Sequence, residues 1–349
     1  MTIRSAVSVQ SPGKLFLLGE YAVLFGAPAI VRAVDRYVHV RVEPVLDPMA
    51  SDIEVVSRGL AVPDLNANWD DKLVFVNARP EHSLVTLVLG GLAQTGTIQA
   101  RMGKCRCTID SRELFYGDRK LGLGSSAAVT HALIRAFTDY TRDTDLPSAQ
   151  PLDELAFTLH RAFQNGRGSG ADLGAGVLGG HYRFQRVTGK HLPDLRAVAW
   201  PDGLHCATLW VGRPASTASA LAVLSRFERQ NPGAFTQAVS PLLALAQAGS
   251  DAFEEGDVGT FVRICHDYAH TLAEFGAKVG VDIVSAEHRS LQRLATEHHV
   301  VYKPSGAGNG DFGVAFSHDK RALNQFAAAA QKGMGNALKL GVGRPCHRL

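Results

Sequence analysis

Residues 120–130, KLGLGSSAAVT, have the types and spacing expected of an anion-binding loop that leads into a helix. Gly122 and Gly124 would let the backbone approach a ligand. Ser125 is the expected N-cap of a helix over residues 127–140. Free N–H groups in the first helical turn would then face a phosphate at the positive end of the helix dipole. The simpler alternative is a Gly-Ser turn that only caps the helix.

Other polar groups could add charge or a metal ligand at this loop. The adjacent hydroxyls of Ser125 and Ser126 could contribute a ligand for a magnesium ion carried by a polyphosphate, since magnesium prefers oxygen ligands and keeps several waters. Lys14 follows a turn at residues 11–13 and begins an apolar run over residues 14–18. Its flexible ammonium could reach a phosphate as a mobile point charge. The alternative is a lysine that extends its charge into water at a strand end.

Asp172 is the only carboxylate in a second glycine-rich segment, residues 165–180, which reads NGRGSGADLGAGVLGG. Such a density of glycine argues against a packed helix. A carboxylate in a tight turn, bracketed by Ser169 and small residues, would be held in place and would leave room for a substrate. The alternative is a glycine-rich turn in which Asp172 caps the segment that follows.

Periodicity predicts the elements that would position these groups. Alternating or apolar runs predict strands at residues 14–18, 38–45, 105–109, 181–187, 207–211, 300–303, 314–316 and 337–342. Helical patterns cover residues 81–93, 127–140, 152–163, 217–229, 233–249, 256–275, 285–298 and 320–332. Strands and helices alternate in both halves, so the fold class is α/β or α+β, and periodicity leaves the strand order open.

Composition and charge narrow the class of ligand. The 349 residues are 46% hydrophobic, enough for two domains or one large α/β unit. A net charge of +3, with no dense stripe of Lys and Arg, suits a small anionic substrate better than nucleic acid. The five scattered cysteines indicate free thiols in a reducing compartment. Without a signal peptide or an apolar run of about 18 residues, we expect a cytoplasmic protein with no membrane contact.

Three glycine-rich segments resemble, in order and spacing, the signature motifs of the GHMP kinases, which phosphorylate small metabolites with magnesium ATP. They are residues 12–30 (PGKLFLLGEYAVLFGAPAI), 122–129 (GLGSSAAV) and 303–313 (KPSGAGNGDFG). The resemblance implies an α+β fold with two-layer α/β character. Its N-terminal domain, residues 1–185, would be of the ribosomal protein S5 domain 2 type, and its C-terminal domain, residues 186–349, would be ferredoxin-like. The active site would lie between them.

Finer details resemble the phosphomevalonate kinase branch of this family. Glu20 and Tyr21 stand where mevalonate kinases usually have Glu-His. Residues 160–172 match the branch's H-x-x-x-Q-G-x-x-G-S-G-x-D spacing, with Asn165 in place of the first glycine. Residues 210–217 resemble its W-T-G-x-x-A-S-T segment. The resemblance therefore implies transfer of the γ-phosphoryl group of ATP to 5-phosphomevalonate.

The resemblance also implies roles for three charged residues, and these roles depend on the acceptor being a phosphate monoester. A phosphate monoester is largely dianionic at neutral pH, so catalysis would consist mostly of positioning and charge neutralisation. Lys14 would lie near the transferred phosphoryl group, and Lys120 would lie beside the loop where donor and acceptor meet. Asp172 would hold Lys14 by a salt bridge or accept any residual proton.

The motifs also assign binding residues by position. The nucleotide loop would comprise Gly122, Leu123, Gly124, Ser125, Ser126 and Ala127, with the two serines as candidate magnesium ligands. The acceptor would contact Glu20, Tyr21, Ser169, Gly170, Ser216, Ser219, Gly306, Ala307 and Gly308. The expected partners are therefore ATP, magnesium and a small acceptor, bound by a monomer or a homodimer.

Three alternatives stay open. A mevalonate kinase would phosphorylate an alcohol, so Asp172 would have to act as a true base, and another GHMP kinase would differ in its substrate pocket. A non-catalytic ATP-binding sensor on the same fold is disfavoured by the intact Lys14 and Asp172.

Two features depart from the family pattern. Asn309 replaces a glycine in the third segment, and the glutamate that helps bind magnesium in mevalonate kinases has no clear counterpart near Arg161.

Overall fold

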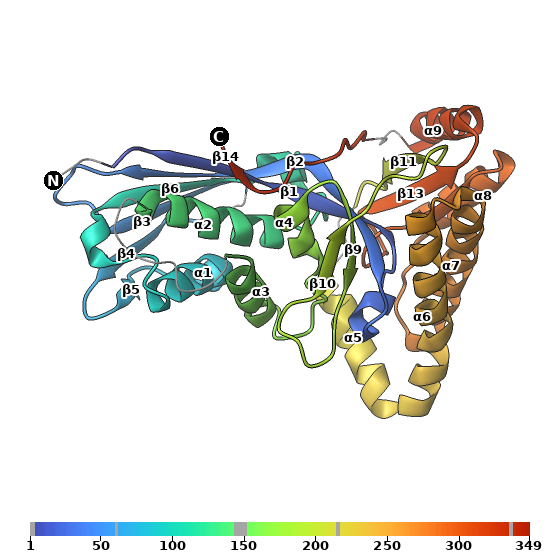
Figure 1. Ribbon diagram of the computed structural model, residues 1–349, viewed down its shortest axis with the longest axis horizontal. Coiled ribbons are helices and arrows are strands. Elements are labelled where there is room, and N and C mark those ends of the chain that lie inside the picture. Colours follow the sequence, from blue (N-terminus) through green and yellow to red (C-terminus); the bar gives the residue numbers. More distant parts are fainter. Residues whose placement is uncertain (1–3, 60–61, 143–151, 214–216, 335–337) are drawn as a thin grey trace.

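The computed structural model describes residues 4–59, 62–142, 152–213, 217–334 and 338–349. Two groups of elements follow one another along the long axis of the molecule (Figure 1). One is a large sheet with helices on one face, and the other is a small sheet packed against long helices. The predicted α+β fold class is confirmed by this mixture of helices with largely antiparallel sheets.

The large sheet has nine strands among the described residues, in the order β10-β9-β2-β6-β3-β4-β5, with β1 paired to β2 and β14. The strands are β1 Val7–Leu18, β2 Ala29–Pro44, β3 Ile53–Arg58, β4 Leu65–Trp69, β5 Leu73–Phe75, β6 Cys105–Asp110, β9 His181–Gln185, β10 Asp194–Ala197 and β14 His347–Arg348. Strand β2 pairs with β1 along one edge, and with β9 and β6 along the other. The long β1–β2 ladder pairs Lys14 with Ala33, so the backbone at Lys14 is held within the sheet.

Four helices accompany this sheet: α1 Ser83–Gln94, α2 Ser125–Thr141, α3 Leu152–Phe163 and α4 Gly174–Leu178. Helix α2 contacts both β1 and β2, and it follows a small hairpin of β7 Phe115–Tyr116 and β8 Arg119–Lys120. The small side chains of Ala128, Ala132 and Ala136 recur every four residues on α2 and are buried. They allow α2 to pack closely, which fixes the loop that precedes it.

The second group contains a three-stranded antiparallel sheet in the order β11-β13-β12. Its elements are β11 His205–Trp210, α5 Thr217–Gln230, α6 Pro232–Glu255, α7 Val258–Val279, α8 Ala286–Glu297, β12 Val301–Pro304, β13 Phe312–Ser317 and α9 Lys320–Met334. One hydrophobic core runs through both groups, since Leu18 and Phe253 belong to the same buried cluster. At Gly249 of α6 an added Cβ would lie 2.4 Å from Cδ2 of Leu18. Glycine is therefore what lets α6 approach the end of β1.

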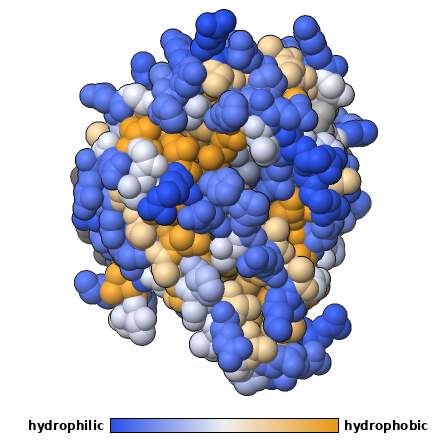
Figure 2. Space-filling view, turned by 90° about the vertical axis from the view of Figure 1, so that its right-hand side faces the viewer, coloured by the Kyte–Doolittle hydropathy of each residue, from blue (hydrophilic) through white to orange (hydrophobic). Residues whose placement is uncertain are grey.

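Polar side chains cover most of the face seen from the right-hand side of Figure 1, with smaller apolar areas between them (Figure 2). The long helices of the second group thus direct their apolar stripes inward, as surface helices of a globular protein do. In the part of the chain that the structure describes, none of the helices combines the length and the apolar character needed to span a lipid bilayer.

Some predicted elements differ from the observed ones. Helix α6 continues past the predicted end at residue 249 to Glu255, because Gly249 serves close packing rather than termination. The strand predicted at residues 337–342 is wrong for its described part, where Val342 makes only an isolated bridge with Val34. The chain end pairs instead through β14, which lies beside β1.

The division at residues 185 and 186 stays a prediction, and strand pairing crosses it twice. Strand β10 follows the boundary in the sequence but pairs with β9 of the large sheet. Strand β14, at the chain end, also joins that sheet. Local periodicity does not reveal such pairing, because β10 and β14 are too short and too exposed to alternate clearly.

A buried ion pair connects the two groups of elements. Glu20 follows β1, and its Oε1 accepts a hydrogen bond from Nζ of Lys303 on β12; their side chains are 1% and 0% exposed. Lys303 also donates to the carbonyl of Pro304 at 3.1 Å, and the hydroxyl of Tyr268 on α7 donates to the carbonyl of Glu20 at 2.6 Å. Such a pair is strongly destabilising when only one partner is removed, because the other charge stays buried.

We expect Lys303→Met to lower the free energy of unfolding by about 3–5 kcal/mol, since it leaves the Glu20 carboxylate without a counter-charge. The double variant Glu20→Met with Lys303→Met should lose much less, because no charge stays buried. Arg41→Met is the control, since the exposed pair of Arg41 with Glu43 should contribute at most about 1 kcal/mol. Urea unfolding at constant pH measures all three. A Lys303→Met variant no less stable than Arg41→Met would contradict the structural role of the pair.

Candidate active site

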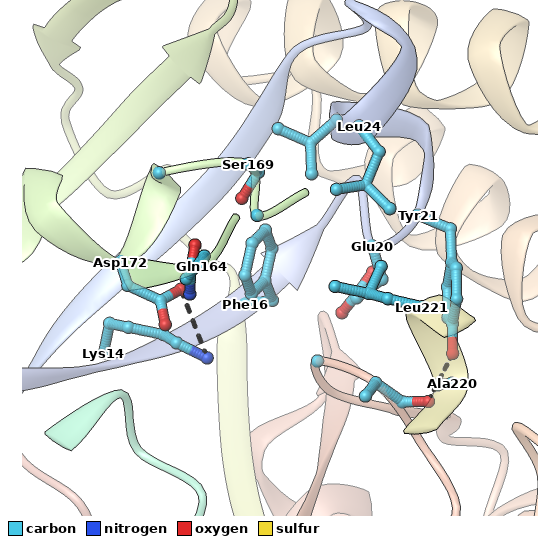
Figure 3. A pocket seen from close by; sticks show the side chains of 15 residues that line it. Lys14, Phe16, Glu20, Tyr21, Leu24, Gln164, Ser169, Asp172, Ala220 and Leu221 are labelled. Carbon is cyan, nitrogen blue, oxygen red and sulfur yellow. Dashed lines mark hydrogen bonds and ion pairs between the residues drawn. The ribbon is translucent and has the colours of Figure 1, made fainter. Parts of the chain in front are cut away.

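Lys14 and Asp172 lie together at one end of a cavity between the two groups of elements (Figure 3). Lys14 comes from β1, just after a register shift between Pro12 and Gly13, and Asp172 comes from the short helix η5 Ala171–Leu173. Nζ of Lys14 is 3.5 Å from Oδ1 of Asp172, with the side chains 10% and 23% exposed. Nζ also lies 5.1 Å from the ring centroid of Phe16. The two residues predicted to form a salt bridge are thus in contact.

The predicted nucleotide loop wraps around this pair. Lys14 donates its backbone N–H to the carbonyl of Leu123 at 2.8 Å. An added Cβ at Gly124 would lie 3.1 Å from both Oδ2 of Asp172 and Cε of Lys14, and Gly124 has a φ of +78°. A larger residue would be strained there and would crowd the pair. The absence of a side chain at Gly124 is therefore required by the site itself.

The prediction that Ser125 is the N-cap of α2 is wrong. Gly124 occupies the N-cap position in a left-handed conformation, and its carbonyl accepts from the N–H of Ala128 at 3.2 Å. The helix therefore begins at Ser125, and no side chain caps its first turn. The N–H groups at the start of α2 keep their hydrogen-bonding capacity for an anion.

Ser126, in this first turn, contacts a histidine whose role sequence reasoning missed. Its Oγ lies 3.1 Å from Nε2 of His160, near the end of α3. Burial lowers the pKa of His160, and the nearby Asp172 carboxylate partly offsets that decrease. The imidazole is therefore neutral at neutral pH. His160 was visible in the sequence only as the first residue of a motif, not as a partner of the loop.

The described residues contain no cluster of three or more His, Cys, Asp or Glu side chains that could hold a metal ion. A metal at this loop would therefore be held by few protein oxygens, with phosphates and water completing its shell, which is typical of magnesium. The hydroxyl of Ser126 fits that use because it is only half-buried, whereas Ser125 is 4% exposed.

Six of the nine predicted acceptor-binding residues line the cavity. They are Glu20, Tyr21, Ser169, Gly170, Gly306 and Ala307. The hydroxyl of Tyr21 donates to the carbonyl of Ala307 at 2.6 Å, which fixes the third glycine segment against the first. Because the Glu20 carboxylate already pairs with Lys303, its contact with an acceptor stays a prediction.

The remaining predicted residues lie elsewhere. Gly308 does not line the cavity, since an added Cβ would lie 2.3 Å from the carbonyl oxygen of Ile283. Ser219 is exposed on α5, where its neighbours Ala220 and Leu221 face the cavity instead. Ser216 lies outside the described residues. The motifs group Gly308 and Ser219 with the cavity residues. Close packing against Ile283 keeps Gly308 out of the cavity, and the helical phase of α5 turns Ser219 away from it.

Lys120 precedes the glycine loop on β8 and is exposed. Neighbouring protein atoms nevertheless remove enough water to lower the pKa of its ammonium group, and Lys14 adds to that decrease. The carboxylates of Asp311 and Asp172 oppose it. The charges of Lys14 and Asp172 therefore act on Lys120, which lies next to the glycine loop.

A second, larger cavity of about 340 Å³ adjoins the first and shares its wall at Gln164 and residues 168–170. Arg161, Arg186 and Lys190 line it, and no Asp or Glu does. Burial, together with the positive charge of Arg161, lowers the pKa of Arg186. Sequence reasoning missed this basic cavity because its residues come from α3 and from the loop after β9, which no common motif connects.

Comparisons with known proteins identify a matching family and several similar proteins. The model of the family "GHMP kinases N terminal domain" matches residues 94–180. Phosphomevalonate kinase from Streptomyces sp. strain CL190 is 30% identical over 334 residues, which cover 87% of this chain and 88% of that protein. Mevalonate kinase from Pyrococcus abyssi is 25% identical over 240 residues, which cover 68% of this chain and 65% of that protein.

A solved structure has a similar fold. Phosphomevalonate kinase from Streptococcus pneumoniae, in complex with phosphomevalonate and AMPPNP, superposes with a TM-score of 0.74. The alignment covers 96% of this chain and 99% of that chain at 19% identity. The fold therefore extends over nearly the whole length of both proteins.

Behind the site, His131 on α2 packs against Gly176, where an added Cβ would lie 2.7 Å from the ring. Burial lowers the pKa of His131 to about 4, and His160 adds to the effect. The native state therefore resists protonation of His131. The neutral imidazole makes its full contribution to the free energy of unfolding above about pH 6.5, and this contribution is lost as the pH falls toward 4.

We expect the wild-type protein to lose about 2 kcal/mol more stability than His131→Leu between pH 7 and pH 5, because the leucine cannot be protonated in the unfolded chain. Urea unfolding at the two pH values measures this difference. His266→Leu, at an exposed position on α7, is the control and should keep the wild-type pH dependence. Equal pH dependence of His131→Leu and the wild type would contradict the buried neutral state.

Proposed function

The chain belongs to the GHMP kinase family, and on that premise we propose that it transfers the γ-phosphoryl group of ATP to 5-phosphomevalonate, giving 5-diphosphomevalonate. The relative named phosphomevalonate kinase is matched over more of its length, and at higher identity, than the mevalonate kinase of Pyrococcus abyssi. The observation that carries the choice of acceptor is the contact of Asp172 with Lys14. An ammonium group held in place beside the point of transfer suits an acceptor that is already ionised, because it offsets the negative charge.

The donor would bind at the start of α2. The positive φ angles of Gly122 and Gly124 shape the loop before α2, and the uncapped N–H groups of the first turn would donate to phosphate groups. The hydroxyl of Ser126 would help to hold magnesium, with the more buried Ser125 as the second candidate ligand, and the metal would supply charge neutralisation to the phosphates. ATP bound in this way would direct its γ-phosphate toward Lys14.

The reaction joins two anions. An oxygen of the acceptor phosphate forms a bond to the γ-phosphorus, and the bond from that phosphorus to the β–γ bridging oxygen breaks, which releases ADP. No proton has to be removed when the acceptor is dianionic. Lys14 would neutralise charge on the transferred group, with Lys120 beside the loop, and Asp172 would hold Lys14 in place.

The second cavity supports an acceptor that is charged at both ends. Arg161, Arg186 and Lys190 line it without an acidic neighbour, so it favours an anionic group. Ser169 borders both cavities, whereas residues of the nucleotide loop border neither. A phosphate placed at Lys14 would therefore allow the carboxylate of 5-phosphomevalonate to extend past Ser169 toward these cations.

The test is ADP release by the purified protein with 5-phosphomevalonate, mevalonate or galactose as acceptor. We expect kcat/KM for 5-phosphomevalonate to exceed that for mevalonate by on the order of 10² or more, because the cations near Lys14 need an ionised acceptor phosphate. Phosphorus NMR of the product should show a diphosphate. Faster turnover of mevalonate would make the protein a mevalonate kinase, and nucleotide binding with no turnover would favour a sensor.

A further inference from the structure

His160 occupies a buried position directly behind the nucleotide loop. The residue is 1% exposed, and its Nε2 lies 3.1 Å from Oγ of Ser126. Its Nδ1 is buried and has no hydrogen-bond partner among the described residues. The hydroxyl of Ser126 is thus the only hydrogen-bonding contact that the described structure gives this ring.

Packing alone does not account for an imidazole at this position. The buried face of α3 is otherwise apolar, with Leu155, Ala156 and Leu159 next to His160. An unpartnered polar atom in such a place is destabilising, and a leucine would fill the space without that cost. The histidine is therefore best explained by what it does for Ser126.

The contact can orient the serine oxygen. A neutral ring with its proton on Nδ1 accepts a hydrogen bond from the Ser126 hydroxyl at Nε2. Both lone pairs of Oγ then point away from the ring and are available to a cation. Ser126 lies in the uncapped first turn of α2, where the backbone N–H groups already suit a phosphate. One side chain thus prepares the loop for a metal ion that accompanies the phosphates.

We propose that His160 is a positioning residue that fixes the Ser126 hydroxyl so that its oxygen binds the magnesium of the bound nucleotide. The inference deepens the proposed function and rests on it for the nucleotide, but not for the acceptor. Partners that orient a metal ligand typically change metal affinity by about 10- to 100-fold when they are removed. Loss of His160 should therefore weaken metal–nucleotide binding and leave acceptor binding unchanged.

The test measures binding of manganese with a non-hydrolysable ATP analogue by electron paramagnetic resonance, without acceptor or turnover. We expect His160→Leu to raise the dissociation constant by on the order of 10-fold. His160→Gln should keep most of the affinity, because its side-chain oxygen can still accept from Ser126. His131→Leu is the matched control, since it removes a neighbouring buried imidazole that does not contact the loop, and it should bind like the wild type.

A double-mutant cycle with Ser126→Ala separates positioning from packing. When the hydroxyl is absent, His160→Leu should weaken binding no further. Equal weakening by His160→Leu with and without the hydroxyl would overturn the inference, as would a His160→Gln variant as weak as His160→Leu. Failure of the wild type to bind the manganese–nucleotide would overturn both this inference and the proposed function. Normal binding with no phosphorylation of 5-phosphomevalonate would reject the proposed acceptor alone.

Discussion

The buried ion pair of Glu20 with Lys303 is the constraint on which the site depends. It joins the turn after β1 to β12, two segments that are far apart in the sequence and belong to different sheets. Two neighbouring hydrogen bonds act in the same place: Tyr21 donates to the carbonyl of Ala307, and Ser305 donates to the carbonyl of Phe16 at 2.8 Å. Together they hold the third glycine segment against the strand that carries Lys14, and the cavity lies between them.

The glycine loop is tied to the same strand from the other side. An added Cβ at Gly13 would lie 2.8 Å from the carbonyl oxygen of Leu123, so β1 and the loop are too close at this point for a side chain to fit between them. Lys14 and Asp172 then meet against Gly124, where neither the loop nor the carboxylate leaves room for a side chain. The site thus contains two close approaches, at Gly13 and Gly124, that leave no room for a side chain, and one buried ion pair stabilises the assembly.

Residues in glycine-rich turns are the part of the site that the sequence could predict. Lys14 could be predicted because it follows a glycine turn and begins an apolar run, and Asp172 because it is the only carboxylate in its glycine-rich segment. The bounds of α3, Leu152–Phe163, agree with the prediction because its apolar period is clear. Long-range partners could not be found in this way. Nothing near Glu20 indicates that its carboxylate pairs with Lys303, and nothing near Ser126 points to His160. The left-handed Gly124, which replaced Ser125 as the N-cap, also depends on contacts from other elements.

The central claim is that Lys14 acts on the transferred phosphoryl group while Asp172 holds it in place, and a double-mutant cycle of single-turnover rates tests it most directly. With saturating ATP and 5-phosphomevalonate, Lys14→Ala should lower the rate by about 10²–10³, as for other groups that stabilise charge in a transition state. Asp172→Asn should be no worse, and the double variant should fall short of the product of the two losses. A much slower Asp172→Asn variant, with losses that multiply in the double variant, would contradict the claim and make Asp172 a general base.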